Sequence, residues 1–307
     1  MRLRRAAAVT FTCGLVLLSG CTAAAGVDGD LLDDWPAVAA PTPFTPIRGK
    51  CHLSGHKDSN SETLASYRPV DCAQEHGAET VYVGRFTGEA AAQPSPPADG
   101  SLAHRAAYAQ CDKRASAYVG DEWREGHLVL GVVMPSSFGW RGGGRWFRCD
   151  LTEMDSHPDV VAQLIAYGED NRRVRSLFGA LRGASALRLG CYRYNEADSS
   201  RPAITPVACN RPHNLEFVGV YTAPPGTLYP EGRSAWSRLH EGCRRVIAAY
   251  VNVPYDRNIA YRSGVFAQPS PETDWAAGNR GVRCFLWLPD RTVSRSLKGA
   301  GAGGLPF

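Results

Sequence analysis

The sequence lacks the short motifs that identify most hydrolases and nucleotide-binding enzymes. It contains no H-E-x-x-H, G-x-S-x-G or P-loop stretch. None of its ten cysteines forms the C-x-x-C pair that zinc sites commonly use. We therefore assign no catalytic residue, metal or cofactor from the sequence. No long unbroken apolar run follows Cys21, so the body of the chain has no predicted membrane-spanning helix.

Excess charge is also scarce. The formal net charge is +4 over 307 residues, and Arg2, Arg4 and Arg5 at the extreme N-terminus supply three of those charges. The remainder carries almost no net charge, so the basic surface that nucleic-acid binding requires is missing. We expect no nucleic-acid partner.

The N-terminus has the order of a lipoprotein signal. The three arginines precede an apolar segment, 6–18, that is too short to span a bilayer, and Leu18-Ser19-Gly20-Cys21 resembles a lipobox. This predicts a signal peptide at 1–20, a diacylglyceryl anchor on Cys21 and a flexible Ala/Pro-rich stalk at 21–47. The protein would be exported and held on the outer face of the membrane. The alternative is an ordinary secretory signal with a chance cysteine.

Eight cysteines remain after the anchor, and they fall into two sets of four. An even number of cysteines in an exported chain predicts disulfides. The two sets are Cys51, Cys72, Cys111 and Cys149, then Cys191, Cys209, Cys243 and Cys284.

The sequence patterns around these cysteines occur twice in the chain. The pattern C-x-x-x-H-x-x-E occurs at 72–79 and 209–216, W-x-x-G-x-R-x-x-R-C at 140–149 and 275–284, and R-S-L-x-G-A at 175–180 and 295–300. A tyrosine also follows the third cysteine of each set by seven residues, at Tyr118 and Tyr250. Because these signatures recur in one order, we interpret the chain as a tandem duplication with units at 48–183 and 188–302.

Periodicity predicts the same α+β fold for both units. Alternating residues predict strands at 79–84 and 216–221, and further strands are expected at 127–134, 146–151 and 282–288. Helix formers, interrupted only by Gly242, predict long helices at 102–119 and 234–251. A short amphipathic helix is expected at 159–167. Each unit would be a mainly antiparallel sheet of order β-β-β-α-β-β, covered by one long helix and stapled by disulfides.

Four cysteines in a unit allow three pairings, and spacing alone does not choose among them. We favour first with second and third with fourth in each unit. The first pair would close a segment between neighbouring strands, and the second would tie the helix to the last strand.

The repeated acid–base pairs, His76 with Glu79 and His213 with Glu216, are the main candidate site. They would form either a structural network, in which each glutamate pairs with Arg145 or Arg280, or a metal, catalytic or ligand-binding dyad. Valines at 81, 83, 218 and 220 share the parity of the glutamates, which places each carboxylate on the buried side.

Two tryptophans and two arginines complete the set. Trp140 and Trp275 either cover the edge of the core or form a stacking platform for a sugar or peptide. Arg148 and Arg283 each precede a strand cysteine, so they are expected to point to the opposite, solvent-facing side.

These motifs together resemble the septum formation domain family of actinobacterial envelope proteins. The second unit matches best, through Pro206–Gly219, Trp275–Leu286 and Arg295–Gly299. The first unit departs from the pattern because Glu75 replaces a proline and the regions 91–100 and 158–172 are expanded. The resemblance implies an association with septum formation and the cell envelope, without a reaction or an established ligand.

Two classes of function remain open. The first is a lipid-anchored binding or scaffold module whose partner is an envelope or division protein or a cell-wall ligand. The second is an envelope hydrolase or metal-dependent enzyme that uses the His/Glu pairs. Burial of Glu79 and Glu216 against arginine would favour the first, and exposure of both carboxylates in a cleft would favour the second.

Overall fold

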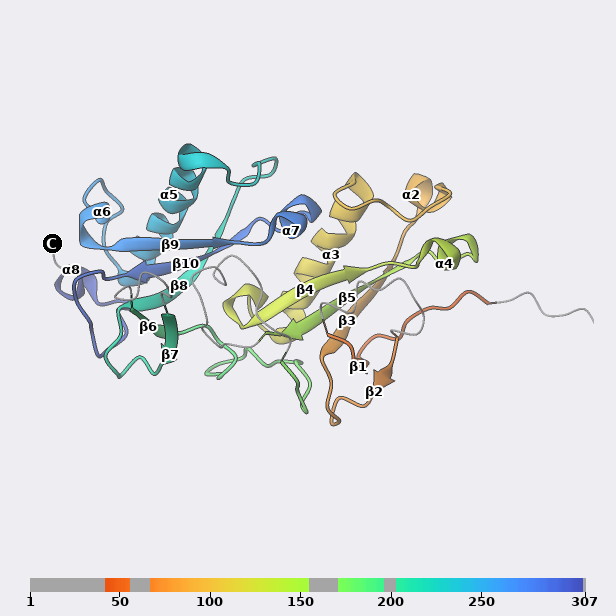
Figure 1. Cartoon of the computed structure of the whole chain (residues 1–307), viewed down its shortest axis with the longest axis horizontal. Helices are drawn as coiled ribbons and strands as arrows, with labels where there is room; N and C mark the ends of the chain where they lie inside the picture. Colours follow the sequence, from red (N-terminus) through yellow and green to blue (C-terminus); the bar gives the residue numbers. More distant parts are fainter. Residues whose placement is uncertain (1–41, 56–66, 155–170, 196–202, 306–307) are drawn as a thin grey trace, which may run out of the picture. The chain divides into compact units, whose positions relative to one another are not determined.

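Each half of the chain builds one five-stranded antiparallel sheet, and the strands follow the same spatial order in both. The computed structural model describes residues 42–55, 67–154, 171–195 and 203–305. The order is β2-β1-β3-β5-β4 in the first sheet and β7-β6-β8-β10-β9 in the second (Figure 1). The first sheet comprises β1 (Cys51–His52), β2 (Pro69–Val70), β3 (Ala78–Arg85), β4 (Leu128–Val133) and β5 (Trp146–Glu153). The second comprises β6 (Cys191–Asn195), β7 (Ala203–Val207), β8 (Leu215–Thr222), β9 (Gly264–Pro269) and β10 (Gly281–Trp287).

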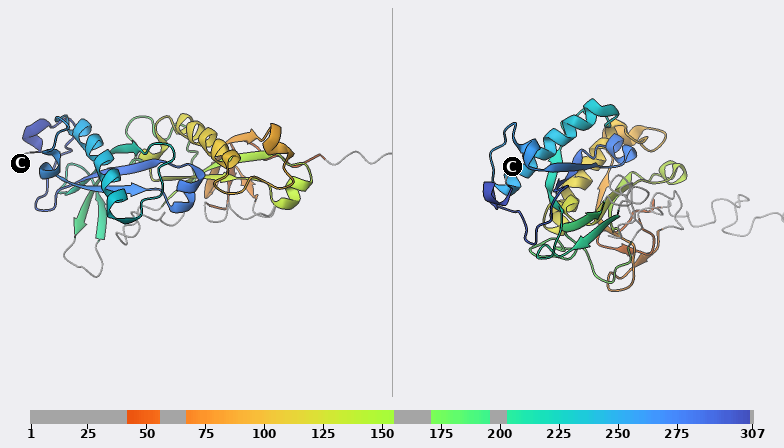
Figure 2. Two further views of the ribbon diagram at one scale, coloured as in Figure 1. Left: turned by 90° about the horizontal axis from the view of Figure 1, so that it is seen from above. Right: turned by 60° about the vertical axis from the view of Figure 1, so that its left-hand side comes forward.

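One long helix packs on each sheet, as the sequence predicts. Helix α3 (Leu102–Val119) packs against β3, β4 and β5, and α5 (Gly232–Val251) packs against β8, β9 and β10 (Figures 1 and 2). The side chain of Ser101 caps the start of α3 by accepting from the His104 N–H, and α3 ends at Gly120, where φ is 91°. The shorter helical segments are α2 (Gly88–Ala92), η2 (Trp123–Glu125), α4 (Ser137–Arg141), α6 (Ile259–Arg262), α7 (Glu272–Ala277) and α8 (Gly301–Gly304).

The central strand pair of each sheet is irregular at the same point. The pairing of β3 with β5 skips Val81, and the pairing of β8 with β10 skips Val218. Each skipped valine lies two residues after the repeated glutamate and is buried in the core of its half. A bulge of this kind is a specific local feature, so its recurrence extends the likeness of the halves from sequence to backbone.

Four disulfides tie these elements together, all within halves. They are Cys51–Cys72, Cys111–Cys149, Cys191–Cys209 and Cys243–Cys284, with Cα–Cα distances of 5.1–5.2 Å. In each half the first bond joins the start of one strand (β1 or β6) to the turn that follows its neighbour (β2 or β7). The second bond fixes the long helix to β5 or β10. This is the pairing favoured from the expected positions of the cysteines on neighbouring strands and on the long helix.

The two sheets differ in one layer of side chains. In the second sheet, Tyr192, Phe217 and Phe285 belong to an aromatic cluster that contains no residue of α5. The strand registers place His52, Thr80 and Asp150 at the corresponding positions of the first sheet. There, His52 Nε2 donates to Thr80 Oγ1 (2.8 Å), which donates to Asp150 Oδ1 (2.7 Å). A buried polar chain in one half thus stands where the other half has aromatic packing.

The prediction that Arg148 and Arg283 face solvent is wrong. Arg148 is 3% exposed and donates to Asp150 Oδ2 at 2.8 Å. Arg283 donates to three backbone carbonyls of the first half, those of Arg124, Gly126 and Leu128, at 2.7–3.0 Å. Strand parity correctly points both side chains away from the cysteines, but that face is covered: by Tyr67 over Arg148, and by the first half over Arg283.

Arg124 reinforces this joint from the other direction. Its Nε donates to Asn279 Oδ1 at 2.8 Å, while its Nη1 contacts the carboxylates of Asp112 and Glu122. Both halves therefore belong to one compact unit, Pro43–Phe307. No helix in the described ranges is long and apolar enough to cross a membrane. The predicted lipobox, most of the predicted stalk and the predicted helix at 159–167 lie outside the described residues.

Candidate functional site

The repeated sequence signatures converge on one carboxylate in each half. Glu79, the second residue of β3, is 1% exposed. It accepts hydrogen bonds from the Tyr118 hydroxyl, the Ser176 hydroxyl (2.6 Å) and the Leu177 N–H (2.6 Å). These donors come from the end of α3 and from the R-S-L segment that follows β5, so Glu79 joins strand, helix and closing segment.

The second half repeats this arrangement residue for residue. Glu216, 2% exposed, accepts from the Tyr250 hydroxyl (2.7 Å), the Ser296 hydroxyl and the Leu297 N–H (2.9 Å). The matching leucines, Leu177 and Leu297, are each 1% exposed and belong to the hydrophobic cores. Each glutamate therefore anchors a segment that inserts a leucine into the core of its own half.

The two histidines fasten the same segments through their backbones. His76 exchanges two hydrogen bonds with Arg173, and His213 exchanges two with Val293, at 2.8–2.9 Å. Each ring also donates from Nδ1 to a carbonyl two residues earlier, that of Gln74 (2.8 Å) or Arg211 (2.7 Å). Because a carbonyl can only accept, Nδ1 carries the ring proton.

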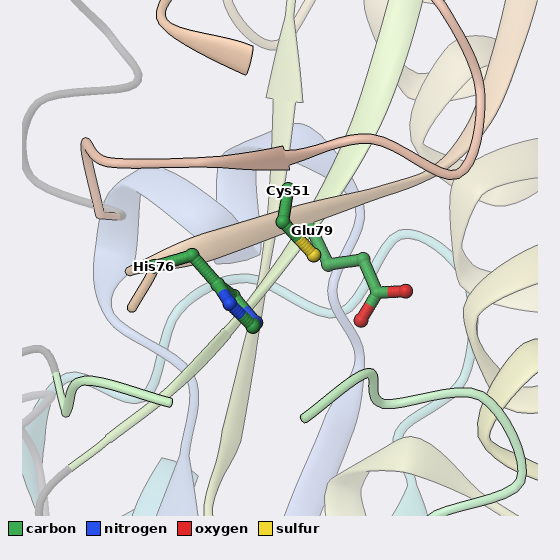
Figure 3. Close-up of side chains that lie close together, drawn as sticks. All are labelled: Cys51, His76 and Glu79. Atoms are coloured by element: carbon green, nitrogen blue, oxygen red, sulfur yellow. The ribbon is translucent and has the colours of Figure 1, made fainter. Parts of the chain in front are cut away.

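The other ring nitrogen is the unusual feature of the site. Nε2 of both histidines is buried and has no hydrogen-bond partner among the described residues. In the second half it lies 3.8 Å from Glu216 Oε2. In the first half, Cys51, His76 and Glu79 lie together, with ligand atoms within 4.8 Å of one another (Figure 3). In the neutral ring, whose proton is on Nδ1, Nε2 accepts, as a carboxylate oxygen does, so neither satisfies the other.

This geometry fits a metal ion poorly. The third member of each cluster, Cys51 or Cys191, is locked in a disulfide and cannot supply a thiolate. That leaves two donors, whereas structural zinc takes four protein ligands and catalytic zinc takes three. Both donors are also almost fully buried.

The tyrosine hydroxyls remain donors at neutral pH. Burial, together with the hydrogen bond to Glu79, raises the pKa of Tyr118 to about 12. The same causes raise the pKa of Tyr250 above its ordinary value. Each glutamate therefore has a permanent donor from the helix, and helix and strand stay linked across the neutral range.

The expected pairing of the glutamates with Arg145 and Arg280 is wrong. Arg145 instead donates to the carbonyls of Ala91 (2.6 Å) and Trp140 (2.5 Å), and Arg280 donates to that of Trp275. Each guanidinium also lies over the indole of its tryptophan, 4.2 Å and 4.8 Å from the ring centroid. The arginines therefore hold the turn before the last strand, at the opposite end of that strand from the glutamate.

The two tryptophans are core residues in this structure. Trp140 and Trp275 are 0% and 2% exposed, so neither presents an open face for stacking on a ligand. Their indole N–H groups donate to the carbonyls of Gln93 (2.7 Å) and Thr227 (2.8 Å).

Sequence reasoning identified each glutamate and histidine but missed their partners. Tyr118 and Tyr250 stood out only by their distance from a cysteine, and Ser176 and Ser296 only as members of a closing motif. The available signal was that all these features recur in one order. Residues that take part in one interaction are expected to recur together in both halves.

Comparison with known proteins identifies one family. A model of the family described as septum formation matches residues 48–284. No curated protein and no solved structure matches the chain.

Proposed function

The chain belongs to the septum formation family, and we propose that it is a lipid-anchored, extracytoplasmic binding or scaffold protein of the cell envelope. The match covers most of the chain and includes the repeated motifs of both halves up to Cys284; the second R-S-L-x-G-A motif, at 295–300, lies beyond it. Family membership associates the protein with septum formation and with an envelope location. The anchor and the binding role are the proposed steps beyond that association.

The burial of both repeated carboxylates carries this proposal. A general base needs access to its substrate, but Glu79 and Glu216 are almost fully buried. Each is also occupied by three donors of the chain itself. Residues of this kind maintain the fold. The function would then be performed by the surface of the folded unit, through binding to a partner.

Two features support export and anchoring. Four disulfides suit an oxidising compartment outside the cytoplasm. Leu18-Ser19-Gly20-Cys21 provides the lipobox through which a diacylglyceryl group would be attached. The stalk at 21–47 would then separate the folded unit from the membrane surface.

The tandem duplication is part of the same proposal. Strand order, bulge position, disulfide pattern and the glutamate network all recur between 48–183 and 188–302. We take the two units to be copies of one septum-formation-like module, fused through the Arg124 and Arg283 contacts.

The second candidate function is an envelope hydrolase or metal-dependent enzyme. The observation in its favour is the unpartnered Nε2 of His76 and of His213. This function requires the segments at 171–177 and 291–297 to move away and open the dyads.

Crosslinking in living cells separates these functions. A photo-crosslinking residue at exposed Tyr261 or Phe138 should capture a discrete envelope or division protein, and capture should persist when His76 and His213 are replaced together by Gln. A folded double variant that fails in cells while capturing the same partner would instead favour the enzyme. Failure to capture any discrete species from either site would contradict the binding role.

A further inference from the structure

A pocket of about 530 Å³ lies beside the edge strand β4, away from the glutamate networks. It is lined by the Pro-rich loop at 95–99, by His104 and Tyr108 of α3, by residues 130–135, and by Asp274 of α7. This volume is in the range of pockets that bind ligands, roughly 300–1,000 Å³. Strand β4 lies at the edge of its sheet (Figure 1), so one side of its backbone pairs with no other strand. Residues 130–133 of this strand line the pocket.

The backbone polarity of β4 follows from one hydrogen bond. The N–H of Met154 donates to the His127 carbonyl, so residues 129, 131 and 133 pair with β5. Residues 128, 130 and 132 then direct their N–H and C=O groups outward. Arg283 takes the outward carbonyl of Leu128. Within the described parts of the chain, the outward groups of Leu130 and Val132 have no partner.

The opposite wall of the pocket is poorly suited to pair with β4. Pro96 and Pro97 of this loop have no N–H to donate to the strand. The loop belongs to the Pro-rich region that is expanded in the first half, at 91–100. The outward side of β4 therefore borders a preformed wall; Leu130 is 2% exposed, whereas Val132 and Met134 are partly exposed and are the residues that an incoming chain would meet first.

The charge of the pocket favours a basic ligand. Asp99 and Asp274 contribute carboxylates, and no lysine or arginine is among the lining residues. The Asp99 side chain is 93% exposed and lies 3.6 Å from His104 Nδ1. That nitrogen accepts the Gly100 N–H at 3.0 Å, so the His104 proton is on Nε2. Burial lowers the pKa of His104, which keeps the ring neutral at pH 7.

We propose that this pocket binds an extended segment of a partner protein that carries a lysine or arginine and adds to β4 as a further strand. Main-chain hydrogen bonds to Leu130 and Val132 would provide affinity, and the carboxylates would select the basic side chain. The partly exposed side chains of Val132 and Met134 would contact the alternate residues of the added strand. The inference deepens the proposed binding role and rests on it.

The test uses random decapeptides displayed on phage and panned against the immobilised full chain. Val132→Pro removes one outward donor while leaving the hydrogen bonds between β4 and β5 in place, and Val132→Ala is the matched control that keeps the N–H. Selected peptides should be rich in β-branched residues with at least one lysine or arginine. They should bind the proline variant roughly tenfold more weakly than the alanine variant, as expected for one lost hydrogen bond.

Two further measurements locate the site. Bound peptide should slow amide hydrogen exchange at Leu130 and Val132, and Asp99→Asn should weaken binding of the basic peptides. Absence of any enriched peptide, equal binding to both Val132 variants in molecules with equal melting temperatures, or protection elsewhere would overturn the proposal. If Val132→Pro leaves the crosslinked partner in cells unchanged, this site fails while the general binding role stands. If the chain with Val132 unchanged captures no partner from Tyr261 or Phe138, the binding role itself is refuted.

Discussion

The hydroxyl of Tyr250 donates to Oε1 of Glu216 across 2.7 Å, joining the last turn of α5 to the start of β8. Tyr118 and Glu79 stand in the same relation in the first half. In both places the closing segment completes the bond network with a serine hydroxyl and a leucine N–H. A single carboxylate therefore fixes three elements that are far apart in sequence.

Removing that carboxylate should act on stability. Glu216→Ala leaves the Tyr250 hydroxyl, the Ser296 hydroxyl and the Leu297 N–H without their acceptor, and each such loss costs about 1–3 kcal/mol. We expect the free energy of unfolding to fall by about 3–5 kcal/mol in urea titrations. Tyr250→Phe, which removes one donor and leaves the carboxylate its other two, should cost about 1 kcal/mol.

His213→Ala should likewise act mainly on stability, because the ring ties down its own turn through Arg211. A His213→Ala or Glu216→Ala protein that melts like the wild type but fails in cells would contradict this and favour a ligand-binding dyad.

Stability should also depend on pH through His52. Burial lowers the pKa of this histidine from 6.5 to about 4, against the opposing charge of Asp150. Its Nε2 donates to Thr80, and its Nδ1 has no partner among the described residues. Because the pKa of His52 is lower in the folded state, at pH values between about 4 and 6.5 the histidine is protonated in the unfolded chain but not in the folded chain. This contribution is complete above pH 6.5 and is lost as the pH falls toward 4.

The measurement is urea unfolding at about pH 7 and about pH 4.5. At about 1.4 kcal/mol per unit of pKa shift, His52 contributes up to about 3 kcal/mol to the difference. His52→Gln keeps a donor for Thr80 but does not titrate, so its stability should vary less with pH. Identical pH dependence in both proteins would show that His52 is not the source.

Membrane attachment should depend on Cys21. Cys21→Ala removes the only sulfur that the lipobox presents, so the chain should remain unprocessed or leave the membrane. Detergent-phase partitioning of cell fractions reports the change, with Cys13→Ala in the predicted signal segment as the control. An unchanged distribution of the Cys21 variant would refute the anchor.

Local sequence rules were sufficient for the two long helices and for the strands β3, β4, β5, β8 and β10. The range 102–119 is the observed extent of α3, because a run without glycine or proline ends at Gly120, which adopts the left-handed conformation that terminates helices. Strands β3 and β8 followed from alternation, and the disulfide pairing followed from the strands and helices in which the cysteines were expected to lie.

The hydrogen-bond partners of the two glutamates could not be predicted from local sequence rules. Glu79 lies 39 residues from Tyr118 and 97 from Ser176, and no periodicity relates such distances. Opposite charge suggested an arginine instead, but Arg145 is used to hold the turn at Trp140. Similarly, strand parity gave the direction of Arg283, whereas the surface it meets is set by how the two halves pack.

Arg283 provides a test of that packing. Replacing it by Met removes hydrogen bonds to the carbonyls of Arg124, Gly126 and Leu128 while keeping much of the side-chain volume. Three acceptors lose a charged donor, so we expect a loss of about 2–4 kcal/mol in the free energy of unfolding. Hydrogen exchange should rise at the neighbouring amides of His127 and Leu189, whose backbone hydrogen bonds lie beside the Arg283 contacts.

Arg193→Met is the matched control. Arg193 is exposed and, among its observed contacts, donates only to the Pro212 carbonyl at 3.2 Å, so its replacement should cost at most about 0.5 kcal/mol. Equal stability of the two variants would mean that the halves are joined without help from Arg283.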